Sequence, residues 1–261
     1  MDISLDKFSD DAKPLVELLF SADWPEAVAD FLICQDLEEE KQERAEGILE
    51  FIGENYFNKK VLDFGTGEGH VAKELAKTAS LAVGYDIKKS GSLPWEMNNN
   101  LLLTTDFNEV AAKGPYDLVI LYDVLDHCVD PIDALKKVAS VVNSESKVFI
   151  RFHSWMSRHA THLYKKINKA WIHLVFTDEE FALMGIKQDF VYKYFLPIIT
   201  QTQWIELCGF TIINQDLVRT NVEPFFWRPE IQARLPLHKF ENKFPDWQMS
   251  QVFNDYLIKL K

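Results

Sequence analysis

One ten-residue stretch, Val61 to His70, limits the folds open to this chain more than any other part of its sequence. It reads Val-Leu-Asp-Phe-Gly-Thr-Gly-Glu-Gly-His, so four residues that can form a buried strand are followed directly by glycines at positions 65, 67 and 69. Residues 71–79 follow with apolar side chains at helical spacing, which completes a strand–turn–helix unit. Glycines at such a turn let the chain reverse tightly and let its backbone approach a ligand. The stretch therefore predicts an open α/β sheet whose ligand binds at the carboxyl ends of the strands.

Three later segments repeat the pattern of an apolar strand followed by an acid. They cover residues 81–87, 101–107 and 116–127, and a further apolar strand is predicted at 147–152. Successive strand–helix units with apolar strands predict a doubly wound parallel sheet. Asp86 lies 21 positions after Gly65, which is close to the interval at which an acid that binds ribose hydroxyls follows a glycine-rich loop.

Asp63 and the three glycines resemble motif I of the class I S-adenosylmethionine-dependent methyltransferases, which is an acid, any residue, and then Gly-x-Gly-x-Gly. Nicotinamide-binding Rossmann domains, the rival with the same fold, place their third glycine one residue later. The resemblance spans about residues 45–152, including a segment similar to the family's Asp-Val-Leu-Glu-His-Val with Asp126 at the Glu position. It implies an α/β fold with a doubly wound, seven-stranded, mostly parallel sheet, an N-terminal helical extension and inserted helices on the substrate side.

The resemblance also implies the cofactor, S-adenosyl-L-methionine, with S-adenosyl-L-homocysteine as the product. Asp86 would accept hydrogen bonds from the ribose, while Asp106 and Phe107 would meet the adenine. An alternative stays open for Asp106, which can equally form the turn at a strand end. The residues expected to bind the cofactor are Asp63, Phe64, Gly65, Thr66, Gly67, Gly69, His70, Asp86, Ile87, Asp106, Phe107, Tyr122 and Asp123.

The segment that leaves the fifth predicted strand, residues 151–176, contains no acid and four of the seven histidines. Because ligand-facing loops follow the strands, we expect it to border a small acceptor, and its donors suit an anionic or nucleotide-like molecule. A solvated basic helix face is the alternative. We predict no metal site, because the histidines lack neighbouring acids and cysteines. The expected acceptor contacts are Arg158, His159, His162, Tyr164 and Lys165.

Catalysis by this chain would consist of alignment of the acceptor and removal of its proton. His127 and His153 each follow a predicted strand and are the candidate bases, while Arg151 would orient an anionic acceptor. The sequence thus predicts methyl transfer to oxygen or nitrogen of a small molecule. A methyltransferase acting on RNA or DNA and a non-catalytic cofactor-binding module remain alternatives.

The chain length of 261 residues allows one large domain with additions. Residues 1–57 carry sixteen acidic and four basic side chains, which accounts for the whole formal charge of −12. We expect 1–57 to form a helical cap packed on the core, with one helix that is capped by Asp23 and continues to Cys34. Residues 58–261 would form the catalytic domain, with 151–200 as a substrate-facing insertion. Strands are expected at 211–218 and 222–227, followed by a terminal helix over 248–260.

The compartment is predicted from what the sequence lacks. Its three cysteines are far apart and in no metal-binding spacing, which is typical of a reducing compartment. The acidic first residues do not have the pattern of a signal peptide, and no apolar run reaches the ~18 residues of a membrane span. We therefore expect a cytoplasmic protein with no membrane partner, whose oligomeric state the sequence does not set.

Overall fold

The computed structural model describes residues 4–28, 37–90, 99–154, 157–160, 163–186, 198–219, 224–234 and 251–261. The chain divides into two compact units. Residues 35–152, 193–216 and 254–261 form a sheet unit, and residues 1–34, 153–192 and 217–253 form a second unit. Among the described residues, no helix is both long and apolar enough to cross a membrane.

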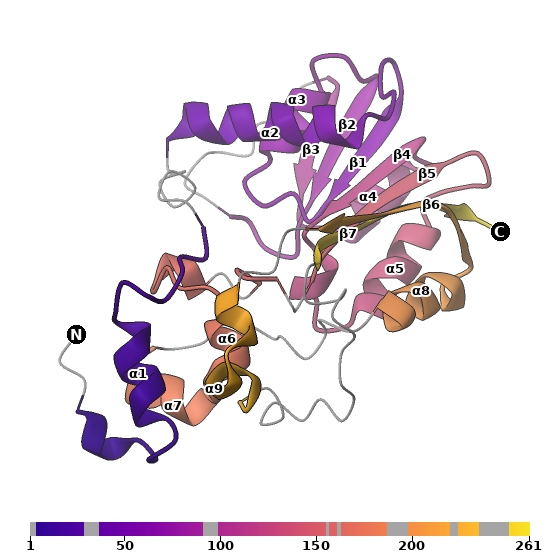
Figure 1. The fold of residues 1–261 in the computed structure, drawn as a ribbon. Coiled ribbons are helices and arrows are strands. Elements are labelled where there is room, and N and C mark those ends of the chain that lie inside the picture. Colours follow the sequence, from indigo (N-terminus) through magenta and orange to yellow (C-terminus); the bar gives the residue numbers. More distant parts are fainter. Residues whose placement is uncertain are drawn as a thin grey trace. The chain divides into compact units, whose positions relative to one another are not determined.

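The sheet has seven strands in the order β3-β2-β1-β4-β5-β7-β6 (Figure 1). The pairings that join β3, β2, β1, β4 and β5 are parallel. This arrangement confirms the predicted doubly wound α/β fold. The strands are β1 Lys60–Phe64, β2 Leu81–Tyr85, β3 Leu101–Thr104, β4 Leu118–Tyr122, β5 Lys147–His153, β6 Phe210–Arg219 and β7 Gln251–Leu260.

Helices cover both faces of the sheet because the side chains of its buried strands alternate between two cores. Val61 of β1 packs in the core shared with α2 (Glu38–Ile52) and α3 (His70–Leu75), whereas Leu62 packs in the core on the opposite face. That second core contains residues of α4 (Phe107–Lys113), α5 (Pro131–Ala139) and α8 (Ile198–Leu207) (Figure 1). The parallel strands are therefore buried on both sides, as their apolar sequences predict.

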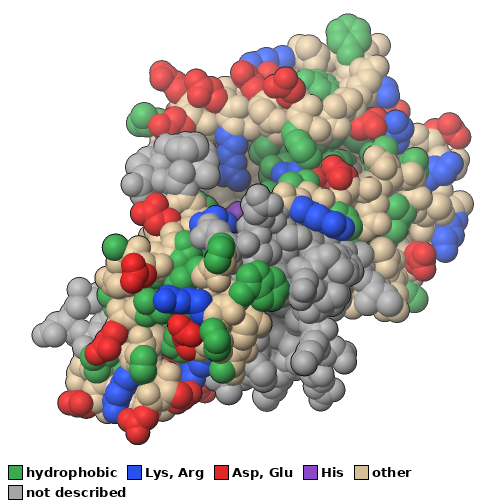
Figure 2. All heavy atoms as spheres, in the orientation of Figure 1, with side chains coloured by type: hydrophobic (Ala, Val, Ile, Leu, Met, Phe, Trp, Pro, Cys, Tyr) green, Lys and Arg blue, Asp and Glu red, His purple; other side chains and the backbone are tan. Residues whose placement is uncertain are grey.

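Local sequence signals explain where several helices begin and end. Asp130 caps α5 by accepting a hydrogen bond from the Asp133 amide, and Pro131 occupies the first helical position, as predicted. Gly53 ends α2 in the left-handed conformation that glycine adopts most readily. Acidic side chains gather on the outer surface of α2 (Figure 2), where they are solvated.

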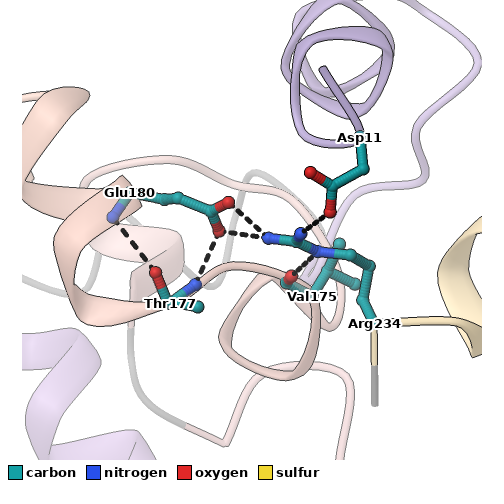
Figure 3. A network of polar contacts seen from close by, with 5 residues as sticks. All are labelled: Asp11, Val175, Thr177, Glu180 and Arg234. Carbon is teal, nitrogen blue, oxygen red and sulfur yellow. Dashed lines mark hydrogen bonds and ion pairs between the residues drawn. The ribbon is translucent and has the colours of Figure 1, made fainter. Parts of the chain in front are cut away.

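The second unit contains the short helices α1 (Lys13–Leu19), α6 (Ile172–Val175), α7 (Asp178–Leu183) and α9 (Pro229–Gln232). Buried Arg234 connects three of its segments. The guanidinium donates to the Val175 carbonyl at 3.0 Å, to Asp11 Oδ2 at 2.6 Å and to both carboxylate oxygens of Glu180 (Figure 3). Glu180 also closes the capping box of α7 with Thr177.

The structure corrects the predicted terminal helix over 248–260, because residues 251–260 form strand β7. Tyr256 and Ile258 are buried at a spacing of two, and Asp255, which precedes Tyr256, pairs with Arg151 of β5. These long-range contacts override the helical spacing of the local apolar residues. The seventh strand predicted at 222–227 is also wrong within the described residues, since Pro224–Trp227 is a 3₁₀ helix.

The helix predicted to begin after Asp23 is not present over residues 24–28. The Trp24 indole donates to the Ala170 carbonyl at 2.8 Å, and the Val28 amide donates to Asn168 Oδ1 at 3.0 Å. The Val28 amide therefore donates to a distant side chain instead of to the Trp24 carbonyl of a preceding helical turn, and that carbonyl accepts from Lys169 Nζ. The remainder of this predicted helix, residues 29–34, lies outside the described residues. The predicted domain boundary at 57/58 stays a prediction.

Removal of the Arg234 side chain should destabilise the second unit more than the loss of a surface arginine. Arg234→Leu leaves Glu180 buried without its partner, which should lower the free energy of unfolding by about 3–5 kcal/mol. Arg228→Leu is the control, because Arg228 forms a solvent-exposed pair with Glu230 and should cost about 1 kcal/mol or less. Urea denaturation of both variants measures this difference, and equal losses would contradict the role given to Arg234.

Candidate cofactor pocket and active site

The glycine-rich loop after β1 is held against β2 by backbone hydrogen bonds. The amides of Gly65 and Thr66 donate to the Tyr85 carbonyl at 2.7 and 2.9 Å. A Cβ atom at Gly65 would clash with Val124, so no larger residue fits there. Gly67 also has a positive φ of 57°, but no atom lies within 4 Å of where its Cβ would be. The loop is therefore tightly packed at Gly65 and open at Gly67, which leaves its backbone accessible to a ligand.

Asp63, the residue before the end of β1, is almost completely buried. It accepts a hydrogen bond from Thr66 Oγ1 at 2.5 Å. Burial nevertheless raises the pKa of Asp63 to about 6, with the nearby Asp86 carboxylate adding to the shift. A buried acid that resists ionisation opposes stability at neutral pH, which is more typical of a ligand-binding residue than of a packing residue.

Asp86, the acid after β2, contacts the glycine-rich loop, and its predicted role in binding ribose stays a prediction. Its Oδ2 accepts a hydrogen bond from the Gly67 amide at 2.9 Å. The next residue, Ile87, has an 80% exposed side chain. The structure thus brings the predicted ribose acid, the open glycine and an exposed apolar side chain to one place.

Asp106 has a structural role as the N-terminal cap of a helix. It caps α4, and its Oδ1 accepts hydrogen bonds from the Asn108 amide and side chain at 2.8 and 3.0 Å. Phe107 packs with its ring 5.5 Å from that of Tyr85. The adenine contacts expected of Asp106 and Phe107 stay predictions.

A pocket of about 450 Å³ opens beside these strand ends in the sheet unit. Six of its residues were expected at a cofactor or catalytic site from the sequence: Phe64, Gly65, Asp86, Ile87, Asp123 and His127. The other residues around it were missed: Tyr85, Val124, Cys128, Val129, Asp130, Asp133, Ala134 and Lys137. The proline and cap at the start of α5 were a usable signal, because they place the first turns of that helix beside the end of β4.

The remaining residues expected at the cofactor lie in the adjoining loop and strand ends. Eight residues predicted to contact the cofactor do not line the pocket: Asp63, Thr66, Gly67, Gly69, His70, Asp106, Phe107 and Tyr122. His70 begins α3 between Glu38 and Glu68, with ring nitrogens 3.4 Å from a carboxylate oxygen of each. Lys41 Nζ pairs with Glu68 at 2.8 Å, so this cluster already contains a cation and we assign no metal to it.

Two acids follow β4, Asp123 partly buried and Asp126 buried. Asp123 has a positive φ of 55°, an uncommon conformation for a residue other than glycine, and Asp126 lies in the 3₁₀ turn Leu125–His127. Burial raises the pKa of both carboxyl groups, and the nearby Asp126 carboxylate adds to the shift of Asp123. His127 completes this turn and has a 39% exposed side chain with Nε2 3.7 Å from Asp126 Oδ2.

Arg151 is buried and fully engaged by neighbours within the sheet unit. Its Nε and Nη2 donate to the two oxygens of Asp255, each at 2.7 Å, and Nη1 donates to the Tyr122 hydroxyl at 2.8 Å. Its guanidinium also lies 4.1 Å from the ring centre of Phe51. These contacts join β4, β5, β7 and α2.

His153 ends β5 and is packed among aromatic rings in the second unit. Its ring centre lies 4.9 Å from that of His159 and 4.6 Å from that of Phe253. Burial, with the positive charge of Arg158, lowers the pKa of His159 to about 4, so this imidazole is neutral at neutral pH. Tyr164 contacts His159 with ring centres 6.3 Å apart.

The basic side chains of this segment are largely used within the second unit. Arg158 donates to the Glu26 carbonyl and lies over the Trp171 ring, and Lys169 Nζ donates to the carbonyls of Ser21 and Trp24 at 2.9 and 3.0 Å. Lys165 is exposed. His162, also expected at the acceptor, lies outside the described residues.

Comparison with known proteins gives a family match over more than half of the chain. Residues 37–186 match a family model described as a methyltransferase domain. The ubiquinone biosynthesis O-methyltransferase of Vibrio campbellii is 29% identical over 118 residues, a match that covers 41% of this chain and 46% of that enzyme. The Klebsiella pneumoniae enzyme of the same name is 26% identical over 197 residues, which is 70% of this chain and 75% of that enzyme. The match thus spans less than half the length of the first relative.

A solved structure has the same fold. The S-adenosylmethionine-dependent methyltransferase of Mesorhizobium loti superposes with a TM-score of 0.50 at 13% sequence identity, covering 82% of this chain and 97% of that one. At this identity the similarity concerns the fold alone.

Replacement of Asp63 by asparagine should stabilise the sheet unit at neutral pH. Because the folded-state pKa is above the ordinary value, the folded protein holds the proton more tightly, and stability falls as pH rises from about 4 to about 6. At one pKa unit per 1.36 kcal/mol, the ionised side chain opposes folding by about 3 kcal/mol above pH 6. Asp63→Asn should remove most of this loss, and urea denaturation at pH 5 and pH 8 measures it. The exposed Glu145→Gln is the control, and an unchanged pH dependence in Asp63→Asn would refute the assignment.

Proposed function

Because the chain belongs to the S-adenosylmethionine-dependent methyltransferase family, we propose that it transfers a methyl group from this cofactor to a hydroxyl oxygen of a small molecule. The observation that carries the proposal is the pocket beside β1, β2 and β4, where Asp86 and His127 lie in one wall. The names of the relatives, both O-methyltransferases, support oxygen over nitrogen as the acceptor atom.

The residues of the pocket and of the adjoining glycine-rich loop fit the cofactor chemically. The open backbone at Gly67 gives a ligand room beside the Asp86 carboxylate, which can accept hydrogen bonds from two ribose hydroxyls. Phe64, Tyr85 and Ile87 supply apolar surface at the same pocket. When bound, the cofactor supplies a methyl carbon already activated by a positively charged sulfur.

The protein's part in the reaction is to align the acceptor, exclude water and accept its proton. We assign the base to His127, because its imidazole lies in the pocket wall and has solvent access. His153, the other candidate, is buried among aromatic rings in the second unit, where its assignment stays a weaker proposal. Arg151 is saturated by Asp255 and Tyr122, which supports a structural role for it in place of contact with the acceptor.

We propose that the acceptor is a small molecule with a hydroxyl group and with little or no negative charge. Arg151, Arg158 and Lys169 donate to groups of the protein itself, so the basic segment offers an anion fewer cations than its sequence suggests. The same contacts weigh against a nucleic acid, since binding of a polymer depends on many unpaired cations along its phosphates.

Substitution of Asp86 should remove cofactor binding. Asp86→Ala loses the charge-assisted hydrogen bonds to ribose, and we expect affinity for S-adenosylhomocysteine to fall roughly a hundredfold or more in calorimetry. Asp133→Ala removes an acid from the same pocket wall and should keep most of the affinity. Because Asp86→Ala also removes the hydrogen bond from the Gly67 amide, the melting temperatures of both variants are compared to detect a loss of stability. If Asp86→Ala keeps its full affinity, Asp86 does not bind the ribose.

A methyl-transfer assay with labelled cofactor tests the proposed reaction. Phenols and aliphatic hydroxy compounds should be methylated, nucleotides and RNA should not, and His127→Gln should lose roughly 10²–10⁴ in kcat with little change in cofactor affinity. Methylation of RNA with a steep salt dependence would favour the polymer alternative. Cofactor binding without transfer to any acceptor would favour a binding module.

A further inference from the structure

We propose that Lys41 of α2 is a positioning residue for the cofactor, which acts by holding Glu68 and with it the middle of the glycine-rich loop. This inference rests on the proposed function, in which that loop meets S-adenosylmethionine. It assigns a role to a side chain that belongs neither to the glycine pattern nor to the pocket wall.

The middle of the loop is less constrained by packing than its two ends. Gly65 and Gly69 are packed so closely that a Cβ atom at either position would clash with a neighbouring side chain. Gly67, by contrast, has no atom within 4 Å of where its Cβ would be. Because glycine loses more conformational freedom on ordering than any other residue, a glycine on each side of Glu68 makes this segment costly to order. Contacts from outside the loop are therefore needed to hold it.

The middle of the loop is held by Asp86 and by Lys41. The Gly67 amide donates to Asp86 Oδ2 at 2.9 Å, and Lys41 Nζ donates to Glu68 Oε2 at 2.8 Å. Asp86 is itself expected to bind the ribose, whereas Lys41 acts on the loop alone. The side chains of Lys41 and Glu68 are 26% and 30% exposed, so the pair is partly shielded from water.

The charge of Glu68 is secure at neutral pH. The hydrogen bond from Lys41 lowers the pKa of Glu68, and His70, with Nε2 3.4 Å from the same oxygen, acts in the same direction. Glu68 is thus an anion at neutral pH, where Lys41 is a cation. The contact is an ion pair between α2 and the loop.

Helix α2 is held in place without the help of Lys41. It lies beside α3 (Figure 1), and Leu49 of α2 packs in one core with Leu75 of α3. Lys77, which follows α3, pairs with Glu46 of α2 at 3.7 Å. A change at Lys41 should therefore release the loop without releasing the helix.

Release of the loop should weaken binding of the cofactor. Without the ion pair, conformations in which Glu68 leaves α2 become accessible, and apparent affinity falls by the fraction of molecules that lose the binding conformation. A coupling free energy of the size of one ion pair corresponds to about a fivefold change in affinity.

The test compares two lysine variants by calorimetry with S-adenosylhomocysteine and by NMR hydrogen exchange without it. Lys41→Met should bind about fivefold more weakly, and the amides of Gly67 and Gly69 should exchange at least about fivefold faster. Lys77→Met removes a lysine that pairs with acids of α2 and α3, and this control should change neither measurement. Lys41→Arg keeps the charge and should recover most of the affinity.

A double-mutant cycle isolates the pair from any other contact of Lys41. Glu68→Gln alone should weaken binding as much as Lys41→Met does. Lys41→Met added to Glu68→Gln should then cost less than about twofold more, because both changes remove the same contact. An equal effect of Lys41→Met in both backgrounds overturns the proposal.

The remaining outcomes separate this inference from the function on which it rests. If the natural protein binds S-adenosylhomocysteine and Lys41→Met binds it equally well, the role of Lys41 is overturned and the proposed function stands. Weaker binding without faster exchange in the loop also overturns that role. A natural protein that binds no S-adenosylhomocysteine overturns the proposed function and this inference with it. If Lys41→Met does not fold, Glu68→Gln decides by the same two measurements.

Discussion

The structure of the site depends on the contact between the glycine-rich loop and the end of β2. The backbone amides of Gly65 and Thr66 donate to the Tyr85 carbonyl, and the next amide, of Gly67, donates to the Asp86 carboxylate. These bonds need a chain with positive φ and no side chain at Gly65, where Val124 fills the space. These bonds fix the positions of the accessible Gly67 backbone and the Asp86 carboxylate relative to one another before a ligand binds.

Three acids near this contact lie in surroundings that disfavour their charged form, at a cost to stability. Asp63, Asp123 and Asp126 each have a pKa raised chiefly by burial, and Asp123 also holds an unfavourable backbone conformation. In contrast, Arg234 and Arg151 are buried with good partners and join distant segments. Groups that oppose folding are thus gathered beside the pocket, as expected of residues whose function needs a perturbed environment.

The sequence was sufficient where the signal is local. The turn at the glycine loop, the parallel strands through β5 and the α5 cap all follow from neighbouring residues and were confirmed. Elements that depend on distant partners were not predictable: β7 pairs with β5, which lies about 100 positions earlier, and the Val28 amide bonds to Asn168 instead of forming a helical turn. The basic segment was misleading for the same reason, since no local pattern shows that Arg158 and Lys169 bond to carbonyls more than 130 positions earlier.

The most direct measurement is calorimetric titration of the natural protein with S-adenosylhomocysteine and, separately, with a nicotinamide dinucleotide. The account predicts saturable one-to-one binding of the adenosyl compound and no heat from the dinucleotide, because the loop spacing and the Asp86 contact suit a ribose without a neighbouring pyrophosphate. Binding of the dinucleotide, or of no adenosyl compound at all, would contradict it.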